Sequence, residues 1–252
     1  MPSMAISSFQ DHFSGVASDY ATYRPRYPQA LFHWLASKAP GRGLAWDCAT
    51  GSGQAAVLLA RHFDRVVASD AAAAQIAEAQ PAAGVQYAVF PAERAELADH
   101  SVDLVTVAQA LHWFDHERFY AEVQRVLAPG GVLAAWTYQL FRVEPAVDAI
   151  IGAWYRGPID AYWPAARRHI EAGYQTIPFP FTPIEAPVFE MEADWRLADV
   201  LGYLGTWSAA KRYRDAHGTD PVALIRGELA RAWGDPKTAR RVVWEMPMLV
   251  GR

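Results

Sequence analysis

Residues 44–54, LAWDCATGSGQ, constrain the fold of this chain more than any other stretch. An apolar run typical of a buried strand ends at an acid, and two glycines separated by one residue follow it. A strand, a glycine-rich turn and a helix in this order are typical of α/β proteins, in which a ligand lies against the bare backbone of the turn. The stretch therefore predicts a parallel sheet with a ligand at this turn.

Strand-like and helix-like segments alternate through the first 140 residues, as they do in parallel sheets covered by helices. A helix is expected to begin at Pro28, and a second one to follow Asp115 as its N-cap and to stop at Pro129. The strands are mostly apolar, as expected for a sheet buried on both faces. They are expected at 44–48, 65–69, 85–90, 102–108 and 131–138.

After residue 138 the pattern changes. Residues 141–175 look helical and are rich in Trp and Tyr, and four prolines then interrupt residues 173–189. We expect this part to cover the sheet and not to form a second domain. The remaining segments are expected to be a strand near 187–193, helices near 196–206, 208–217 and 220–233, and a final strand at 241–250 with Pro247 at an edge or bulge.

Charge and composition narrow the range of partners. The net charge is −4, from 23 basic and 27 acidic residues, and no long basic run is present, so nucleic acid is not an expected partner. The apolar runs are far shorter than the roughly 20 residues of a membrane helix, and no signal peptide is recognisable. The single cysteine, Cys48, gives no internal disulfide and no metal cluster. We therefore expect a cytoplasmic protein with no membrane partner and no bound metal.

Two ligand classes fit the glycine turn. The sequence GSGQAA at 51–56 satisfies the GxGxxA pattern of a dinucleotide site, with Asp70 placed 19 residues after Gly51. Asp47, however, ends the strand where a dinucleotide would place its pyrophosphate, which a carboxylate repels. S-adenosylmethionine carries an ammonium and a sulfonium, has no phosphate, and has ribose hydroxyls that Asp70 can bind. The acids therefore favour S-adenosylmethionine over a dinucleotide.

At these residues the chain resembles the class I S-adenosylmethionine-dependent methyltransferases. DCATGSGQ is similar to their first motif, and VVASD is similar to their second strand with its ribose-binding acid. The resemblance continues through FPAERAEL, SVDLVTVAQALHWFD and LAPGGVLAAW, and it reaches FSGVASDYATYRPRYP near the start and TWSAAKRYRDAHG in the later part. This combination is similar to the type 11 methyltransferases, whose relatives include trans-aconitate methyltransferases.

The resemblance implies a Rossmann-like α/β fold. Its sheet would have seven mostly parallel strands in the order 3-2-1-4-5-7-6, with helices on both faces and a helical lid inserted after strand 5. The chain would form one methyltransferase domain, as a monomer or homodimer. Its parts would be an N-terminal cover (1–40), a cofactor-binding core (41–140), a lid insertion (141–186) and C-terminal strands and helices (187–252).

The resemblance also assigns cofactor contacts by position. Asp47 and Gly51 would lie by the methionine part, Asp70 would bind the ribose hydroxyls, and Gln109 would face the methionine end from the tip of the fourth strand. Ala92 and Glu93 would flank the adenine. The full expected set is Tyr20, Arg24, Asp47, Ala49, Gly51, Gly53, Asp70, Ala71, Ala92, Glu93 and Gln109.

Two positions depart from the family pattern. Ala49 stands where the family usually has its first glycine, and its methyl group is tolerated unless φ there is positive. Pro91 stands where many relatives have an Asp that bonds the adenine, so adenine recognition would rest on other groups, such as the backbone near Ala92.

For the acceptor, His112 is the histidine expected near the reacting methyl group, either as a general base or as a hydrogen-bonded residue that orders its loop. The expected pocket walls are aromatic: Trp113, Trp154, Tyr203 and Trp207. A carboxylate acceptor would need only a cationic clamp, because it is ionised at neutral pH. The arginines considered for this clamp are Arg24, Arg26, Arg142, Arg212 and Arg214.

The leading hypothesis is thus a small-molecule methyltransferase that uses S-adenosylmethionine and acts at a carboxylate or other oxygen, with the carboxylate suggested by analogy with the aconitate enzymes. In such a reaction the protein acts mainly by proximity and orientation. Two alternatives stay open at this point. One is an NAD-dependent oxidoreductase, against which Asp47 argues, and the other is a non-catalytic protein that binds S-adenosylmethionine.

Overall fold

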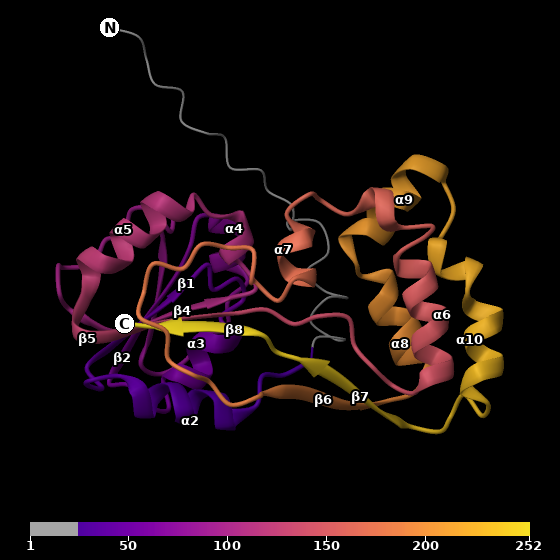
Figure 1. Cartoon of the computed structure of the whole chain (residues 1–252), viewed down its shortest axis with the longest axis horizontal. Helices are drawn as coiled ribbons and strands as arrows, with labels where there is room; N and C mark the ends of the chain where they lie inside the picture. Colours follow the sequence, from indigo (N-terminus) through magenta and orange to yellow (C-terminus); the bar gives the residue numbers. More distant parts are fainter. Residues whose placement is uncertain (1–24) are drawn as a thin grey trace, which may run out of the picture.

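The computed structural model describes residues 25–252, so the predictions for Tyr20 and Arg24 lie outside the described residues. Within them, six strands form a twisted sheet in the order β3-β2-β1-β4-β5-β8. The first five are parallel, and β8 runs antiparallel to β5 (Figure 1). These strands are β1 (Leu44–Cys48), β2 (Arg65–Asp70), β3 (Val85–Val89), β4 (Val102–Ala108), β5 (Leu127–Trp136) and β8 (Met248–Gly251). The expected Rossmann-like, mostly parallel architecture is confirmed.

Helices cover both faces of this sheet. Successive residues of β1 point to opposite faces of the sheet and pack in two different cores. Ala45 packs with the core under α2 (Gln29–Lys38) and α3 (Gln54–Leu59). Trp46 packs with the core under α5 (His116–Val126). A short helix, α4 (Ala73–Ala77), follows β2. The sheet is therefore buried from both sides, as its apolar strands require.

Local signals explain the limits of α5. The Asp115 side chain accepts a hydrogen bond from the Arg118 backbone N–H at 3.3 Å, as an N-cap does. Phe119, Val123 and Val126 form its buried face. The chain turns extended already at Leu127, so β5 begins four residues earlier than the sequence predicted and includes the proline and both glycines.

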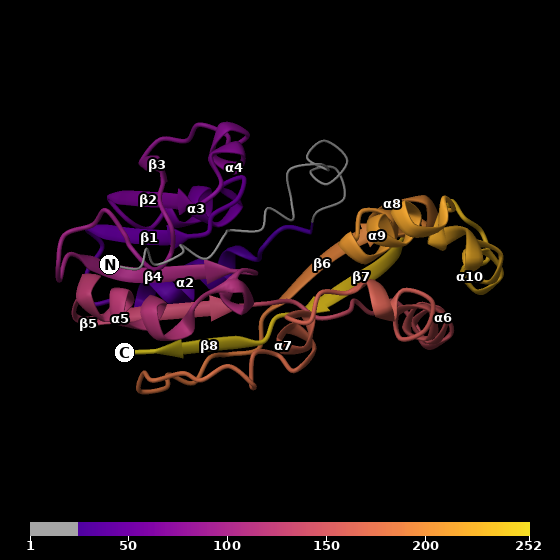
Figure 2. The same ribbon diagram turned by 90° about the horizontal axis from the view of Figure 1, so that it is seen from above.

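A second group of helices lies beyond the carboxyl ends of the parallel strands (Figures 1 and 2). It contains α6 (Pro145–Tyr155), α8 (Leu197–Gly205), α9 (Ser208–His217) and α10 (Arg226–Trp233), with short turns of 3-10 helix at Asp160–Tyr162 and Pro221–Leu224. The short helix α7 (Arg167–Glu171) stands between this group and the sheet in both views. This helical group is built from two chain segments. Helix α6 comes from the region expected to form the lid, and α8 to α10 come from the region expected to form C-terminal strands and helices.

The expectation of seven strands in the order 3-2-1-4-5-7-6 is wrong in its last two positions. The strands β6 (Glu190–Trp195) and β7 (Arg240–Glu245) pair with each other and not with the main sheet, as a ribbon that leads to the helices (Figure 2). In the main sheet β8 takes the place next to β5, and the position beyond it holds only an isolated bridge between Pro183 and Gly251. Because proline has no N–H, the segment with four prolines cannot continue that bridge as a regular strand.

Candidate functional site

The turn between β1 and α3 has a backbone that bends through left-handed conformations. Gly51 has a φ of 56° and Gly53 a φ of 85°. Ala49 also has a positive φ, 55°, so its methyl group is strained and the departure from glycine is not neutral. The backbone N–H of Thr50 donates to the Ser69 carbonyl at 2.8 Å, which ties the turn to the end of β2. The glycine turn therefore has a fixed shape against β2.

Asp70, at the end of β2, bonds to this turn. Its Oδ2 accepts from the Gly51 N–H at 3.0 Å, and its Oδ1 accepts from the Ala72 N–H at 2.9 Å. The predicted loop glycine and the predicted acid, 19 residues apart in the sequence, are thus in direct contact. Ala71, which lies between Asp70 and Ala72 in the turn after β2, is exposed.

Asp47 is fully buried in β1, beside β4. Its Oδ2 accepts from the Thr50 hydroxyl at 2.5 Å and its Oδ1 from the Thr106 hydroxyl at 2.8 Å. Burial raises the pKa of Asp47 from 3.8 to about 6, and the charge of Asp70 adds to this, while the two threonine hydroxyls oppose it. An acid in this state gains from a cation bound nearby.

The charges of three carboxylates act on Cys48 at the end of β1. The pKa of the buried Cys48 thiol is raised first by desolvation and then by the charges of Asp47, Glu93 and Asp70. Glu93 is held by the Asp115 backbone N–H, which donates to its Oε1 at 3.1 Å. No cluster of His, Cys, Asp and Glu within residues 25–252 has the arrangement of a metal site. The negative charge therefore suits an organic cation and opposes a pyrophosphate.

The remaining predicted cofactor residues line the same edge of the sheet. Gln109 directly follows β4 with a φ of 63°, and its Oε1 accepts from the Thr137 hydroxyl at 2.8 Å. Ala92, after β3, is buried. The side-chain amide of Gln54 donates to the Pro25 carbonyl at 3.1 Å, which places the first described residue of the chain at the start of α3. The structure thus brings together the predicted residues that follow β1, β2, β3 and β4.

His112 lies in a turn of 3-10 helix, Leu111–Trp113, that follows β4. It is only 9% exposed, and its Nδ1 lies 3.1 Å from the Tyr174 hydroxyl oxygen. Its pKa is lowered to about 3, first by burial and then by the positive charge of Arg167 and the neighbouring His169 and His116. The imidazole is therefore neutral near pH 7 and is a weak base.

The aromatic residues expected to wall a pocket have different environments. Trp113 is 37% exposed and packs against His112 with ring centroids 4.7 Å apart. Trp207 is half-buried in a cluster of rings, 5.6 Å from the Trp163 ring centroid. Tyr203 is 6% exposed. Trp154 is 1% exposed and donates its indole N–H to the Pro221 carbonyl at 3.0 Å, so it is a core residue of the helical group and not a pocket wall.

The arginines considered as an anion clamp are mostly engaged elsewhere. Arg142 pairs with Glu245 at 2.8 Å, Arg214 lies 3.5 Å from Asp220, and Arg212 donates to the Tyr162 carbonyl at 3.3 Å. Arg26 is exposed, and Arg24 lies outside the described residues. Arg167 of α7, whose charge acts on His112, was not among the residues predicted from the sequence. No local pattern singles it out, because the contact between its region and His112 joins segments far apart in the sequence.

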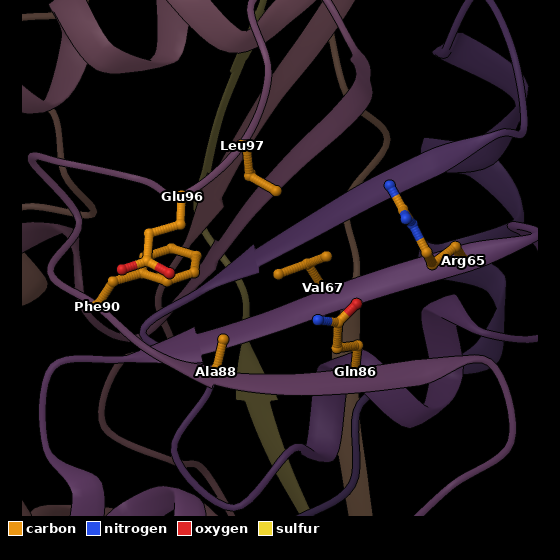
Figure 3. Close-up of a pocket in the computed structure, with 7 residues that line it drawn as sticks. All are labelled: Arg65, Val67, Gln86, Ala88, Phe90, Glu96 and Leu97. Carbon is orange, nitrogen blue, oxygen red and sulfur yellow. The ribbon is translucent and has the colours of Figure 1, made fainter.

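A shallow hollow of about 190 Å³ lies away from these residues, beside β2 and β3 (Figure 3). Its lining includes Arg65, Val67, Gln86, Ala88, Glu96 and Leu97. None of the predicted site residues lines it. It is separate from the site at the carboxyl ends of the strands.

Comparisons with known proteins agree with this geometry. A family model described as a methyltransferase domain matches residues 46–135. A protein of Dictyostelium discoideum described as a methyltransferase is 32% identical over 239 residues, which are 92% of this chain and 91% of the other. The chain belongs to the class I S-adenosylmethionine-dependent methyltransferases. A solved structure from Anaeromyxobacter dehalogenans, described as a type II methyltransferase, is 51% identical, covers 91% of this chain and 97% of its own, and has a TM-score of 0.87.

Membership of this family settles two earlier questions. The methyltransferase prediction is confirmed, and the NAD-dependent alternative is set aside. A more distant structure from Anabaena variabilis, described as a methyltransferase from an antibiotic biosynthesis pathway, has a TM-score of 0.54 at 19% identity and shares the fold alone. As for membranes, no helix within residues 25–252 of this methyltransferase is long and apolar enough to span a bilayer.

Proposed function

We propose that this methyltransferase binds S-adenosylmethionine at the carboxyl ends of β1, β2 and β4 and methylates a small molecule that carries a carboxylate. The observation that carries the proposal is a pair of acids bonded to the glycine turn: Asp70 accepts from the Gly51 N–H, and Asp47 accepts from the Thr50 hydroxyl. A ligand with an ammonium and a sulfonium is attracted there, and bare backbone at Gly51 leaves room for it.

Each residue has a distinct part in this proposal. Asp70 would bind the ribose hydroxyls from its place beside Gly51, and Ala92 would pack on the adenine with Glu93 at its rim. Asp47 has no exposed surface, so it would act as a positioning residue that holds Thr50 of the turn and supplies negative charge beneath the methionine part. Gln109 would face that part from the end of β4.

The environment of His112 favours an acceptor that is already ionised. When bound, the cofactor supplies an activated methyl group, whose transfer to an acceptor oxygen breaks the methyl–sulfur bond and leaves the electron pair on sulfur. A phenol or an ammonium must first lose a proton, and an imidazole with a pKa of about 3 takes it up poorly at neutral pH. A carboxylate needs no base, so the protein has only to hold it in line. His112 would then order the loop through Tyr174.

Cofactor binding is tested by isothermal titration of the protein with S-adenosylhomocysteine. Asp70→Asn is expected to weaken binding at least tenfold, because it removes the charge that receives the ribose hydroxyls. Glu78→Gln, at an exposed position after α4, is the matched control and should leave the affinity unchanged. Equal affinity of the Asp70 variant and the parent protein would refute the proposed site.

Turnover is tested separately, by the release of S-adenosylhomocysteine with a panel of carboxylic acids, phenols and amines. Methylation of acids but not of phenols or amines would support the proposed acceptor class. Binding without release for any member of the panel would favour a protein that holds the cofactor without catalysis.

A further inference from the structure

One arginine near the proposed site forms no direct ion pair with an acid of the described residues. Arg167 begins α7, the short helix that stands between the sheet and the other helices (Figures 1 and 2). The segment after α7 contacts the turn after β4, since the Tyr174 hydroxyl lies 3.1 Å from His112 Nδ1. Arg167 is therefore placed on the lid side of the proposed cofactor site.

Aromatic rings hold the guanidinium of Arg167 in a defined plane. Its central carbon lies 4.5 Å from the Trp163 ring centroid and 5.6 Å from the Tyr155 ring centroid. Its Nε donates to the Tyr155 hydroxyl at 2.8 Å, and that hydroxyl donates to Glu171 Oε1 at 2.6 Å. A side chain fixed at Nε and stacked on an indole presents its two terminal nitrogens as a rigid fork.

The terminal nitrogens of Arg167 form no ion pair within residues 25–252, and Glu171 is linked to its Nε only through the Tyr155 hydroxyl. None of the ion pairs there includes Arg167, although Glu171 lies on the same helix. Arg167 is half-buried, and its charge contributes more than any other to lowering the pKa of His112. A half-buried guanidinium without a carboxylate is costly to keep desolvated, unless an anion binds there.

A second donor beside Arg167 is also without an acceptor. The indole Nε1 of Trp163 is buried and has no hydrogen-bond partner among the described residues. Leaving a buried donor unpaired costs about 1–3 kcal/mol. The same ring stacks on the guanidinium and lies close to Trp207, so the unpaired donor and the unpaired charge belong to one cluster.

We propose that Arg167 is the residue that selects an anionic acceptor, by binding its carboxylate through the two terminal guanidinium nitrogens while Trp163 supports the guanidinium from below. This inference rests on the proposed methyltransferase function and adds to it a residue that determines specificity. A bidentate pair of this kind fixes both the position and the orientation of a planar carboxylate. The acceptor would thus be held on the lid side while the cofactor lies on the sheet side.

The test uses tryptophan fluorescence to measure the binding of acids to the protein saturated with S-adenosylhomocysteine. The probes are small di- and tricarboxylic acids and benzoate, and the same acids are offered for methylation. Arg167→Gln should raise the dissociation constant of the preferred acid at least tenfold and leave that of S-adenosylhomocysteine unchanged. Arg167→Lys should have an intermediate effect, because it keeps the charge but loses the fork and the stacking.

Two controls separate this effect from damage to the fold. Arg168→Gln removes the neighbouring, exposed charge of the same helix and should leave acid binding unchanged. Tyr155→Phe removes the hydroxyl that holds Nε but keeps the cation, so it should weaken acid binding less than Arg167→Gln does.

The outcomes distinguish the inference from the proposed function. If Arg167→Gln binds the acid as tightly as the parent, if Arg168→Gln has the same effect as Arg167→Gln, or if no acid binds the loaded protein, the role of Arg167 is overturned. In each case S-adenosylhomocysteine can still bind and the methyltransferase function would stand, although the absence of acid binding would also remove the proposed carboxylate acceptor. Loss of S-adenosylhomocysteine binding in the parent protein itself would overturn the proposed function instead.

Discussion

Replacing Asp47 with Asn should stabilise the protein while damaging its site. Asp47 is fully buried, and the pKa of its carboxyl group rises from 3.8 to about 6 on folding. Since one pKa unit corresponds to about 1.4 kcal/mol, keeping this acid ionised costs the folded protein about 3 kcal/mol. Asn carries no charge and is nearly the same shape, so it avoids this cost and can still bond to the Thr50 and Thr106 hydroxyls.

The raised pKa of Asp47 sets how the gain in stability of the Asn variant over the parent protein depends on pH. Below about pH 4, Asp47 is protonated in both the folded and the unfolded protein, so the gain should be small. Between about pH 4 and pH 6 the folded state binds more protons than the unfolded state, and the parent protein loses stability as the pH rises. The advantage of the variant should therefore grow through this range and level off above about pH 7.

Urea unfolding of both proteins from pH 4.5 to pH 8 measures the difference directly. Asp215→Asn, at an exposed position of α9, serves as the matched control and should show no such trend. A stability difference between the Asp47 variant and the parent that does not change with pH would refute the reasoning. The same variant should bind S-adenosylhomocysteine more weakly, because the negative charge beneath the methionine part is lost.

The other predictions concern three substitutions, each followed by thermal unfolding and by titration with S-adenosylhomocysteine. Ala49→Gly relieves a left-handed alanine and should raise the free energy of unfolding by up to about 1 kcal/mol, and no gain would show that the strain is absent. Gly53→Ala should lower it by roughly 1–3 kcal/mol and weaken binding, because the added methyl group would overlap the Tyr87 hydroxyl. Trp154→Phe leaves the Pro221 carbonyl without its donor and should lower the free energy of unfolding by about 1–3 kcal/mol, with unchanged affinity for S-adenosylhomocysteine. Weaker binding by this variant would show that Trp154 does line the pocket.

The sequence by itself determined the half of the protein that holds the proposed cofactor site. Five parallel strands follow from local apolar runs, because a strand buried on both faces has to be apolar along its length. The acids at the ends of β1 and β2 could be placed together for the same reason, since parallel strands end at one edge of the sheet. The contact between Gly51 and Asp70 follows from that rule and from the short distance in sequence between them.

Only the tertiary structure decided the other half. The ribbon of β6 and β7 and the edge beyond β8 depend on pairings between segments far apart in the chain, and the prolines of 173–189 show what cannot form there but not what replaces it. Trp154 looked like a pocket wall and is core, because burial depends on neighbours that its own segment does not specify. Arg167 stands out only when Trp163, Tyr155 and the pairing of all other charges are known. Periodicity and motif spacing are local, whereas charge balance and burial are properties of the folded chain.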